Sequence, residues 1–252
     1  MFYILHKIML TSIRQSDSCK VYAKDADKSA APFECPVCGG ETILRKGRFK
    51  IHHFAHKPPV FCAYGKGESE AHRNCKQSIF EALKVSPSIT ECELEKNFGR
   101  VVSDVFFVLD DRKVAIEVQV SNLTMNRIIE RTEAYNDLGI YVLWLPLFNR
   151  KLNEAPYAPK SWEKWLHATY FGRVYYWLEG LSVIPIHYSE YLLWVEETDY
   201  GGGYNRKSKR YRTPECGSIL NILNDFDFRS RSAWEGSGIY IPHCKLLVEN
   251  SH

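Results

Sequence analysis

The chain has 252 residues, of which 45% are hydrophobic and 25% are charged, and its formal net charge is +3. These values are ordinary for a globular protein of one large domain or two small ones, and the charge is too small to require a nucleic-acid partner. The start MFYILHKIML lacks the layout of a signal peptide, and no run approaches the roughly 18 apolar residues of a membrane span. Eight cysteines without a signal peptide favour a reducing, cytoplasmic location, and metal binding over disulfides.

The first predicted element with a chemical signature is a zinc module at residues 33–57. CPVC places two cysteines before a Gly-Gly turn, and TILRKGRFKI predicts a hairpin that turns at Lys46–Gly47. The hairpin leads into HFAH, whose two histidines complete a set of four nitrogen and sulfur ligands, as tetrahedral zinc prefers. A full set of protein ligands leaves no open position, so we expect a structural zinc site formed by Cys35, Cys38, His53 and His56.

Alternatives to this ligand set stay open. His52 competes with His53, because successive residues of a strand point to opposite faces. Cys62, His72 and Cys75 could form a second site, although their spacing matches no complete ligand set. Without metal, the segment would be a reduced cysteine pair with surface histidines.

Residues 68–85 are predicted to form a helix that begins after an N-cap at Ser69. His72 and Lys76 are four residues apart, so they lie one above the other on the same face of this helix. The alternative is a solvated polar face.

A strand at residues 89–98 is followed by two predicted strands joined by a tight turn. The runs VVSDVFFVL and VAIEVQV are rich in β-branched and aromatic residues and flank Asp110–Asp111. A turn centred there places Asp104 directly opposite Glu117, with Cβ atoms about 4.5–5.5 Å apart, and Gln119 points to the same face. The opposed carboxylates repel each other, and a divalent cation such as magnesium would remove the repulsion. The alternative is a buried strand pair with charges at its edge.

Residues 121–139 are predicted to form a second helix, capped by Ser121, Asn122 or Thr124 and ended by Gly139. IYVLWLPL follows as a buried strand. The predicted order of elements is therefore one helix, three strands, a second helix and a fourth strand, in a mixed α/β arrangement.

Two sets of residues are candidates for binding nucleic acid. One set recurs every four residues along a flank of the second helix, where arginines suit phosphates. The other lies in a glycine-led loop, where interleaved basic and aromatic residues suit single-stranded nucleic acid. A solvated helix face and a flexible solvated loop are the alternatives. The candidates are Arg127, Arg131 and Tyr135 on the helix, and Arg206, Lys207, Lys209, Arg210 and Arg212 in the loop.

Asp104, the hairpin and the Glu-x-Gln sequence resemble the PD-(D/E)xK nuclease core, in which an acid and an acid-x-lysine hold a metal beside the scissile phosphate. Here Ser-Asp replaces Pro-Asp, and Gln119 replaces the lysine. Over roughly residues 20–190, the ordered segments FECPVCGG, HHFAHK, GESEAHRNCK, RVVSDV, AIEVQVS and RTEAYNDLGIYVLWL resemble the CoiA family of competence proteins, whose members carry such a nuclease-like domain.

This resemblance implies a restriction-endonuclease-like core at residues 68–150, after a zinc-binding segment at 1–67 and before an α+β extension at 151–252. It also implies that an acid of the first helix joins the site, and Glu68 and Glu70 are both candidates. The implied catalytic set is Asp104, Glu117 and Gln119 from the hairpin, with His72 and Lys76 from the helix.

Two functions follow as hypotheses. The first is a nuclease that acts on DNA with magnesium or manganese held by Asp104 and Glu117, with recombination or competence proteins as partners. The second is a catalytically degenerate, zinc-containing DNA-binding or recombination accessory protein, which the missing lysine supports. The intact carboxylate pair favours the nuclease, because a core freed from metal binding would gain stability by losing that repulsion.

Overall fold

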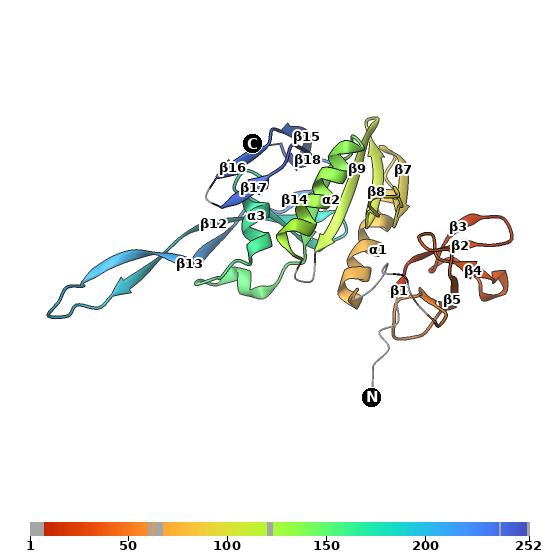
Figure 1. Cartoon of the computed structure of the whole chain (residues 1–252), viewed down its shortest axis with the longest axis horizontal. Helices are drawn as coiled ribbons and strands as arrows, with labels where there is room; N and C mark the ends of the chain where they lie inside the picture. The colour runs from red at the N-terminus through yellow and green to blue at the C-terminus, as the bar shows by residue number, and fades with distance from the viewer. Residues whose placement is uncertain (1–7, 60–61, 63–67, 120–122, 237, 251–252) are drawn as a thin grey trace. The chain divides into compact units, whose positions relative to one another are not determined.

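The computed structural model describes residues 8–59, 62, 68–119, 123–236 and 238–250. The chain divides into two compact units, Met1–Val120 and Ser121–His252 (Figure 1). The segment boundary predicted after residue 67 therefore lies inside the first unit. Within the described residues, no helix is long and apolar enough to cross a membrane.

The first unit opens with a six-stranded antiparallel sheet in the order β1-β6-β5-β4-β2-β3. Its small core contains Met9, Phe33 and Phe54 together with two cysteines. β5 and β6 form the predicted hairpin, but Arg45 pairs with His53, so a loop at residues 46–52 replaces the tight turn. The elements are β1 (Ile8–Met9), β2 (Thr11–Arg14), β3 (Cys19–Tyr22), the 3-10 helix η1 (Lys28–Ala30), β4 (Phe33–Glu34), β5 (Glu41–Arg45) and β6 (His53–His56).

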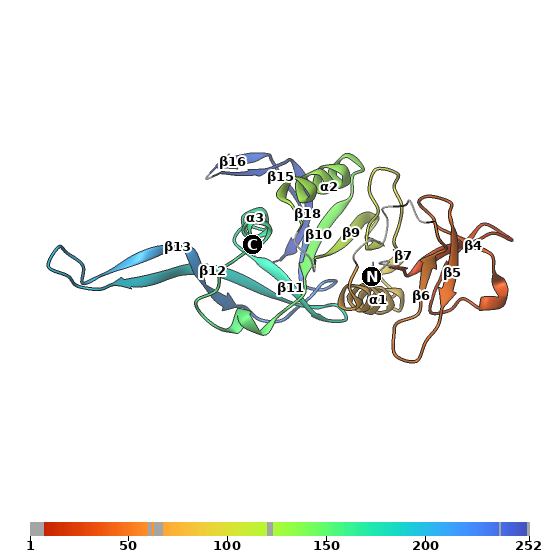
Figure 2. The same ribbon diagram turned by 60° about the horizontal axis from the view of Figure 1, so that its bottom comes forward.

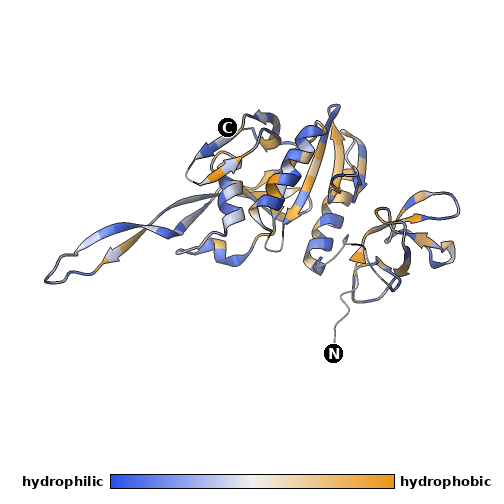
Figure 3. Cartoon of the chain, viewed as in Figure 1, coloured by the Kyte–Doolittle hydropathy of each residue, from blue (hydrophilic) through white to orange (hydrophobic). Residues whose placement is uncertain are grey.

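Helix α1 (Glu70–Lys84) begins where the sequence predicts, because the Ser69 side chain accepts a hydrogen bond from the His72 backbone N at 3.2 Å. Its apolar residues at helical spacing, Ile79, Phe80 and Leu83, are buried. In Figure 3 the following strands β8 and β9 are largely hydrophobic, whereas α1 is largely hydrophilic on the side shown.

Strands β7 (Ile89–Leu94), β8 (Val105–Leu109) and β9 (Arg112–Gln119) form an antiparallel meander. Asp110 and Asp111 both have positive φ, as a type I′ hairpin turn requires. Val105 pairs with Ile116, so the next position in the same register places Asp104 opposite Glu117. The predicted register is therefore confirmed.

The second unit contains the predicted second helix and the strand after it. The Thr124 side chain caps α2, and Gly139, with φ of 70°, follows its last turn. β10 pairs with β18 in parallel, and β18 pairs with β15 in the antiparallel sense. The elements are α2 (Met125–Asp137), β10 (Tyr141–Pro146), the 3-10 helix η2 (Arg150–Asn153), α3 (Ser161–Thr169), β11 (Val174–Glu179), β12 (Ser182–Val195), β13 (Tyr204–Cys216), β14 (Leu220–Asn221), β15 (Phe226–Arg231), β16 (Trp234–Gly236), β17 (Ile239–Ile241) and β18 (Cys244–Glu249).

The glycine-led loop predicted at residues 201–212 is mostly strand, which corrects the sequence interpretation. β13 begins at Tyr204 and pairs with β12, while β11 reaches only Ile186 of β12. Figures 1 and 2 show the outer parts of β12 and β13 as a two-stranded ribbon that extends away from α3 and β11. The basic residues are therefore held in fixed positions along a strand.

Candidate functional site

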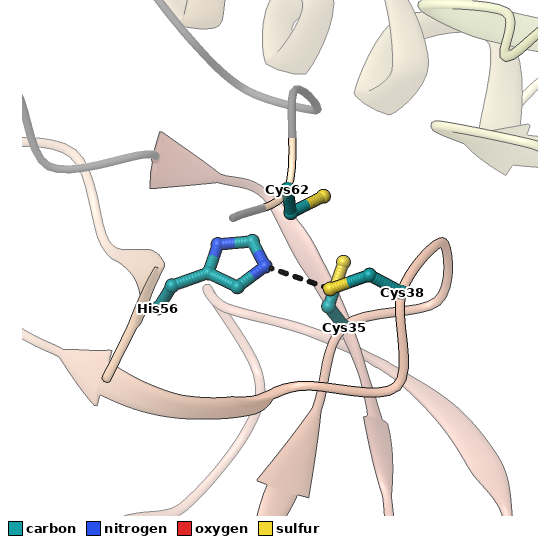
Figure 4. A group of neighbouring side chains, drawn as sticks. All are labelled: Cys35, Cys38, His56 and Cys62. Carbon is teal, nitrogen blue, oxygen red and sulfur yellow. Dashed lines mark hydrogen bonds between the residues drawn. The ribbon is translucent and has the colours of Figure 1, made fainter. Parts of the chain in front are cut away.

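Four side chains of the N-terminal sheet region converge on one point, as Figure 4 shows. The Sγ atoms of Cys35, Cys38 and Cys62 and a ring nitrogen of His56 lie within 4.8 Å of one another. The His56 Nε2 is 3.4 Å from the Cys38 Sγ. Three sulfurs and one imidazole form the kind of ligand set that holds zinc in a tetrahedral site.

The surroundings of the two turn cysteines suit thiolate ligands. The Val37 and Gly40 backbone N–H groups donate to the sulfurs of Cys35 and Cys38, each at 3.4 Å. A Cβ atom at Gly40 would lie 3.3 Å from the Cys38 Sγ, so glycine leaves room for that sulfur. Burial raises the pKa of Cys35 to about 12, so a metal ion would have to displace its proton on binding.

The predicted ligand His53 lies outside this cluster, and Cys62 takes its place. His53 and His56 are three residues apart on a strand, so their side chains point to opposite faces. The His53 Nδ1 instead lies 2.8 Å from the carbonyl oxygen of Ile51. The competing residue His52 lies beside α1, in a groove of about 520 Å³, and is not part of the cluster.

A second cluster forms in the first unit between α1 and the β8–β9 hairpin. Ligand atoms of Glu68, His72 and Asp104 lie within 4.8 Å of one another. The His72 Nε2 is 3.0 Å from Asp104 Oδ2 and 3.7 Å from Glu68 Oε1. Asp104 Oδ2 also accepts a hydrogen bond from the Val118 backbone N at 2.8 Å.

One oxygen of this cluster favours a bound cation. Glu68 Oε2 is buried and has no hydrogen-bond partner among the residues that the structure describes. An unsatisfied buried carboxylate oxygen is costly, and a hard divalent cation binds such oxygens. Two carboxylates and a histidine therefore fit a divalent metal at this position.

Lys76 places a positive charge beside the cluster. Its Nζ pairs with Glu68, lies 2.8 Å from Glu95 Oε1 and 3.7 Å from Asp104 Oδ1, and its side chain is only 3% exposed. Burial alone would lower the pKa of Lys76, but the carboxylates of Glu68 and Glu95 raise it above its usual value. Lys76 is therefore a fixed positive charge and is unsuited to act as a base.

The same balance acts on the other members of the cluster. Burial alone would lower the pKa of His72, but the Asp104 carboxylate raises it. Burial raises the pKa of Glu68, although Lys76 opposes the change. Of the two candidate acids, Glu68 belongs to the cluster, although it lies just before α1 and not in the helix, whereas Glu70 is exposed and lines the groove that contains His52.

Sequence reasoning missed Glu95, which directly follows β7. Its side chain is buried, its φ is 52°, and its backbone N donates to the Asp104 carbonyl oxygen at 3.0 Å. Glu95 therefore lies opposite Asp104, as Asp104 lies opposite Glu117. A hairpin centred on Gly99 and Arg100 would have predicted this pairing from the sequence.

Glu117 and Gln119 are buried on β9, where strand alternation places them on one face. Glu117 does not belong to the cluster of Glu68, His72 and Asp104. Its role as a magnesium ligand and the role of Gln119 stay predictions.

The alternative second site of Cys62, His72 and Cys75 does not form among the residues that the structure describes. Cys62 belongs to the zinc-type cluster, which is Cys35, Cys38, His56 and Cys62. His72 belongs to the carboxylate–histidine cluster with Glu68 and Asp104, and Cys75 is fully buried. The structure thus distributes these three residues over two clusters and the core.

For one residue, the structure corrects the predicted role in nucleic-acid binding. Tyr135 is fully buried and is a core residue, because eight positions along a helix rotate a side chain by about 80° from Arg127. Arg127 is exposed and lies 3.6 Å from Glu130, and Arg131 is half-buried. On β13, Arg206, Lys207, Lys209 and Arg210 are exposed and Arg212 is half-buried.

The order of elements from α1 to β10 is of mixed α+β class and is consistent with a nuclease-like domain. Residues 68–170 match the family description "Competence protein CoiA, nuclease-like domain", and residues 17–65 match "Competence protein CoiA, N-terminal domain". The chain therefore belongs to the CoiA family of competence proteins.

A curated relative agrees with this assignment. The chain is 30% identical over 119 residues to Competence protein CoiA of Bacillus subtilis (strain 168), an alignment that covers 47% of this chain and 32% of that protein. No solved structure matches the chain.

The zinc-type cluster makes a direct prediction. We expect the purified protein to contain about one zinc ion per chain, as a closed structural site does. Cys62→Ser should lose most of this zinc, because it removes one of four ligands, whereas His53→Gln should keep it. Elemental analysis of the folded fraction after dialysis measures both. Zinc-free folded parent protein, or zinc lost from the His53 variant alone, would contradict the assignment.

Proposed function

We propose that this chain is a metal-dependent nuclease that hydrolyses phosphodiester bonds of DNA, in the processing of DNA during competence or recombination. The observation that carries the proposal is the cluster of Glu68, His72 and Asp104, with Lys76 buried beside it. The match to a nuclease-like domain and the name of the Bacillus subtilis relative support the proposal.

Glu68 and Asp104 would hold a magnesium or manganese ion, with Glu117 as the further carboxylate predicted beside them. Such an ion polarises a phosphoryl oxygen and lowers the pKa of a bound water molecule. Lys76 keeps its proton because carboxylates surround it, so it holds Glu68 and Asp104 in place. Gln119 would orient the attacking water by a hydrogen bond, in place of the lysine of the family motif.

One observation favours the alternative of a degenerate, zinc-containing DNA-binding or recombination accessory protein. The carboxylates of the cluster already have the ammonium group of Lys76 and the imidazole of His72 beside them, and Gln119 replaces the motif's lysine. A core without catalysis could keep such buried ion pairs, because removing one partner leaves an uncompensated charge. The two functions differ in whether the protein cleaves DNA.

Cleavage assays with matched variants test the proposal. Asp104→Asn and Glu68→Gln should lower cleavage of labelled linear DNA at least about a hundredfold, since losing a metal ligand costs no less than losing an outer partner. Glu70→Gln is the control, because it makes the same chemical change two residues away on an exposed side chain and should cleave like the parent.

The assays compare magnesium, manganese and a chelator, with circular DNA and RNA as parallel substrates. A parent protein that cleaves with none of the metals would favour the accessory protein. Cleavage by Asp104→Asn at the parent's rate would show that the site is misassigned. Faster cleavage of RNA than of DNA would show that RNA is the substrate.

The basic residues of β13 are proposed to contact the phosphates of bound DNA. Lys207 pairs with Glu190 at 2.6 Å, so Arg206 and Lys209 are the best pair to test. Changing both to Gln should weaken DNA binding and flatten its salt dependence by about 1.4 to 1.8 in log–log slope. Lys151→Gln with Lys164→Gln removes two exposed charges elsewhere in this unit and is the control. Equal slopes for both double variants would leave β13 as solvated surface.

A further inference from the structure

Glu95 joins the candidate site to the N-terminal sheet. One of its carboxylate oxygens, Oε1, accepts a hydrogen bond from Lys76 Nζ at 2.8 Å. The other, Oε2, accepts from the Thr11 backbone N at 3.0 Å and from the Thr11 hydroxyl at 2.8 Å. The Leu10 backbone N lies 3.1 Å from both oxygens. Thus two consecutive residues of the N-terminal sheet region hold the carboxylate that holds Lys76.

These contacts are buried and fully polar. Glu95 is 2% exposed, Lys76 is 2% exposed and Thr11 is fully buried, so water does not compete for their hydrogen bonds. Burial alone would raise the pKa of Glu95, but Lys76 and the donors from Leu10 and Thr11 lower it. Glu95 therefore carries a negative charge whose position two separate parts of the first unit determine.

The backbone of Glu95 adds a second connection to the site. Its N–H donates to the Asp104 carbonyl, and its own carbonyl accepts from Lys20 Nζ at 3.1 Å. Lys20 belongs to β3 of the same N-terminal sheet. The positive φ of Glu95 is uncommon for a non-glycine residue. Side-chain and main-chain contacts together hold this conformation.

The N-terminal contact also depends on the core beside the zinc-type cluster. Met9, the residue before Leu10, packs in the small core that contains Cys35 and Cys62. The position of Leu10 and Thr11 therefore follows from the packing that places these two cysteines.

We propose that Glu95 is a positioning residue for Lys76, and that the N-terminal sheet, through Leu10 and Thr11, is part of the scaffold of the nuclease site. This inference rests on the proposed function for its effect on cleavage. The segment that carries the zinc-type cluster then has a second role, because it orients the charge between Glu68 and Asp104. We expect a change at Thr11, whose hydroxyl hydrogen-bonds to Glu95, to alter the carboxylate–histidine cluster through Glu95 and Lys76.

Two matched pairs of variants in the full-length protein test this proposal. Thr11→Val removes the hydroxyl bond to Glu95, whereas Ser12→Ala removes a neighbouring buried hydroxyl that contacts Glu34 O and Thr42 Oγ1, each at 2.7 Å. Glu95→Gln removes the charge beside Lys76, whereas Glu91→Gln removes a charge on the same strand region that pairs with Lys96. Each pair makes the same kind of change, and only one member reaches Lys76.

Two readouts separate positioning from folding. We expect Thr11→Val to lower kcat about tenfold with little change in KM, the size of one hydrogen bond to a charged group. We expect Glu95→Gln to lower kcat further, Ser12→Ala and Glu91→Gln to behave like the parent, and Thr11→Ser, which keeps the hydroxyl, to restore the rate. Calorimetric titration with Mn²⁺ alone should show weaker binding for Thr11→Val and Glu95→Gln, because the cluster loses its fixed geometry.

The manganese readout needs no cleavage, so the two ideas fail separately. A parent protein that binds Mn²⁺ but never cleaves would contradict the proposed nuclease function. Weaker Mn²⁺ binding by Thr11→Val would still support the positioning role of Glu95. Equal Mn²⁺ affinity in all variants, or equal losses in Thr11→Val and Ser12→Ala, would overturn the positioning role, because the effect would then be absent or due to general destabilisation.

Discussion

The buried charge of Lys76 constrains most of the first unit. An ammonium group removed from water is costly unless carboxylates and hydrogen bonds replace its hydration. Here the carboxylates come from three different places in the chain: before α1, after β7 and before β8. Removing one partner of such a network typically costs about 3–5 kcal/mol. The network therefore fixes α1 against the β7–β8 hairpin, and the same geometry brings the carboxylates of Glu68 and Asp104 together.

The zinc-type cluster lies beside the small core of the N-terminal sheet. The N-terminal sheet has a small core, and strands β1 and β4 are each only two residues long. Small cores of this kind are marginal without a metal or a covalent link. A cluster of three cysteines and one histidine joins the turn after β4, the end of β6 and the segment beyond it. The sheet can then hold Leu10 and Thr11 against Glu95.

The hairpin could be predicted because its register depends on local signals. Two β-rich runs and the turn at Asp110 place Asp104 opposite Glu117 without any knowledge of the tertiary structure. Cys35, Cys38 and His56 could be found for the same reason. The prediction of His53 as a ligand is wrong, because strand alternation places its side chain on the face opposite His56.

The remaining differences depend on tertiary structure. Tyr135 is a core residue, because its direction on the helix differs from that of Arg127 by about 80°. The basic residues predicted in a loop lie on a strand, because β13 pairs with β12. Glu95 contacts the N-terminal sheet across 84 residues of sequence, which no local pattern encodes. The sequence offers Cys62 only for an alternative second site, because no local pattern shows that the fold brings it to His56.

Glu68 and Asp104 are proposed to hold a divalent cation together. Crystals of the zinc-loaded protein soaked in manganese would test it most directly, with anomalous diffraction recorded at wavelengths that distinguish the two metals. We predict a manganese peak about 2.0–2.2 Å from carboxylate oxygens of both residues, with zinc confined to the cysteine–histidine cluster. Manganese absent from the Glu68–Asp104 position in a well-ordered crystal, with both carboxylates still paired to Lys76 and His72, would contradict it.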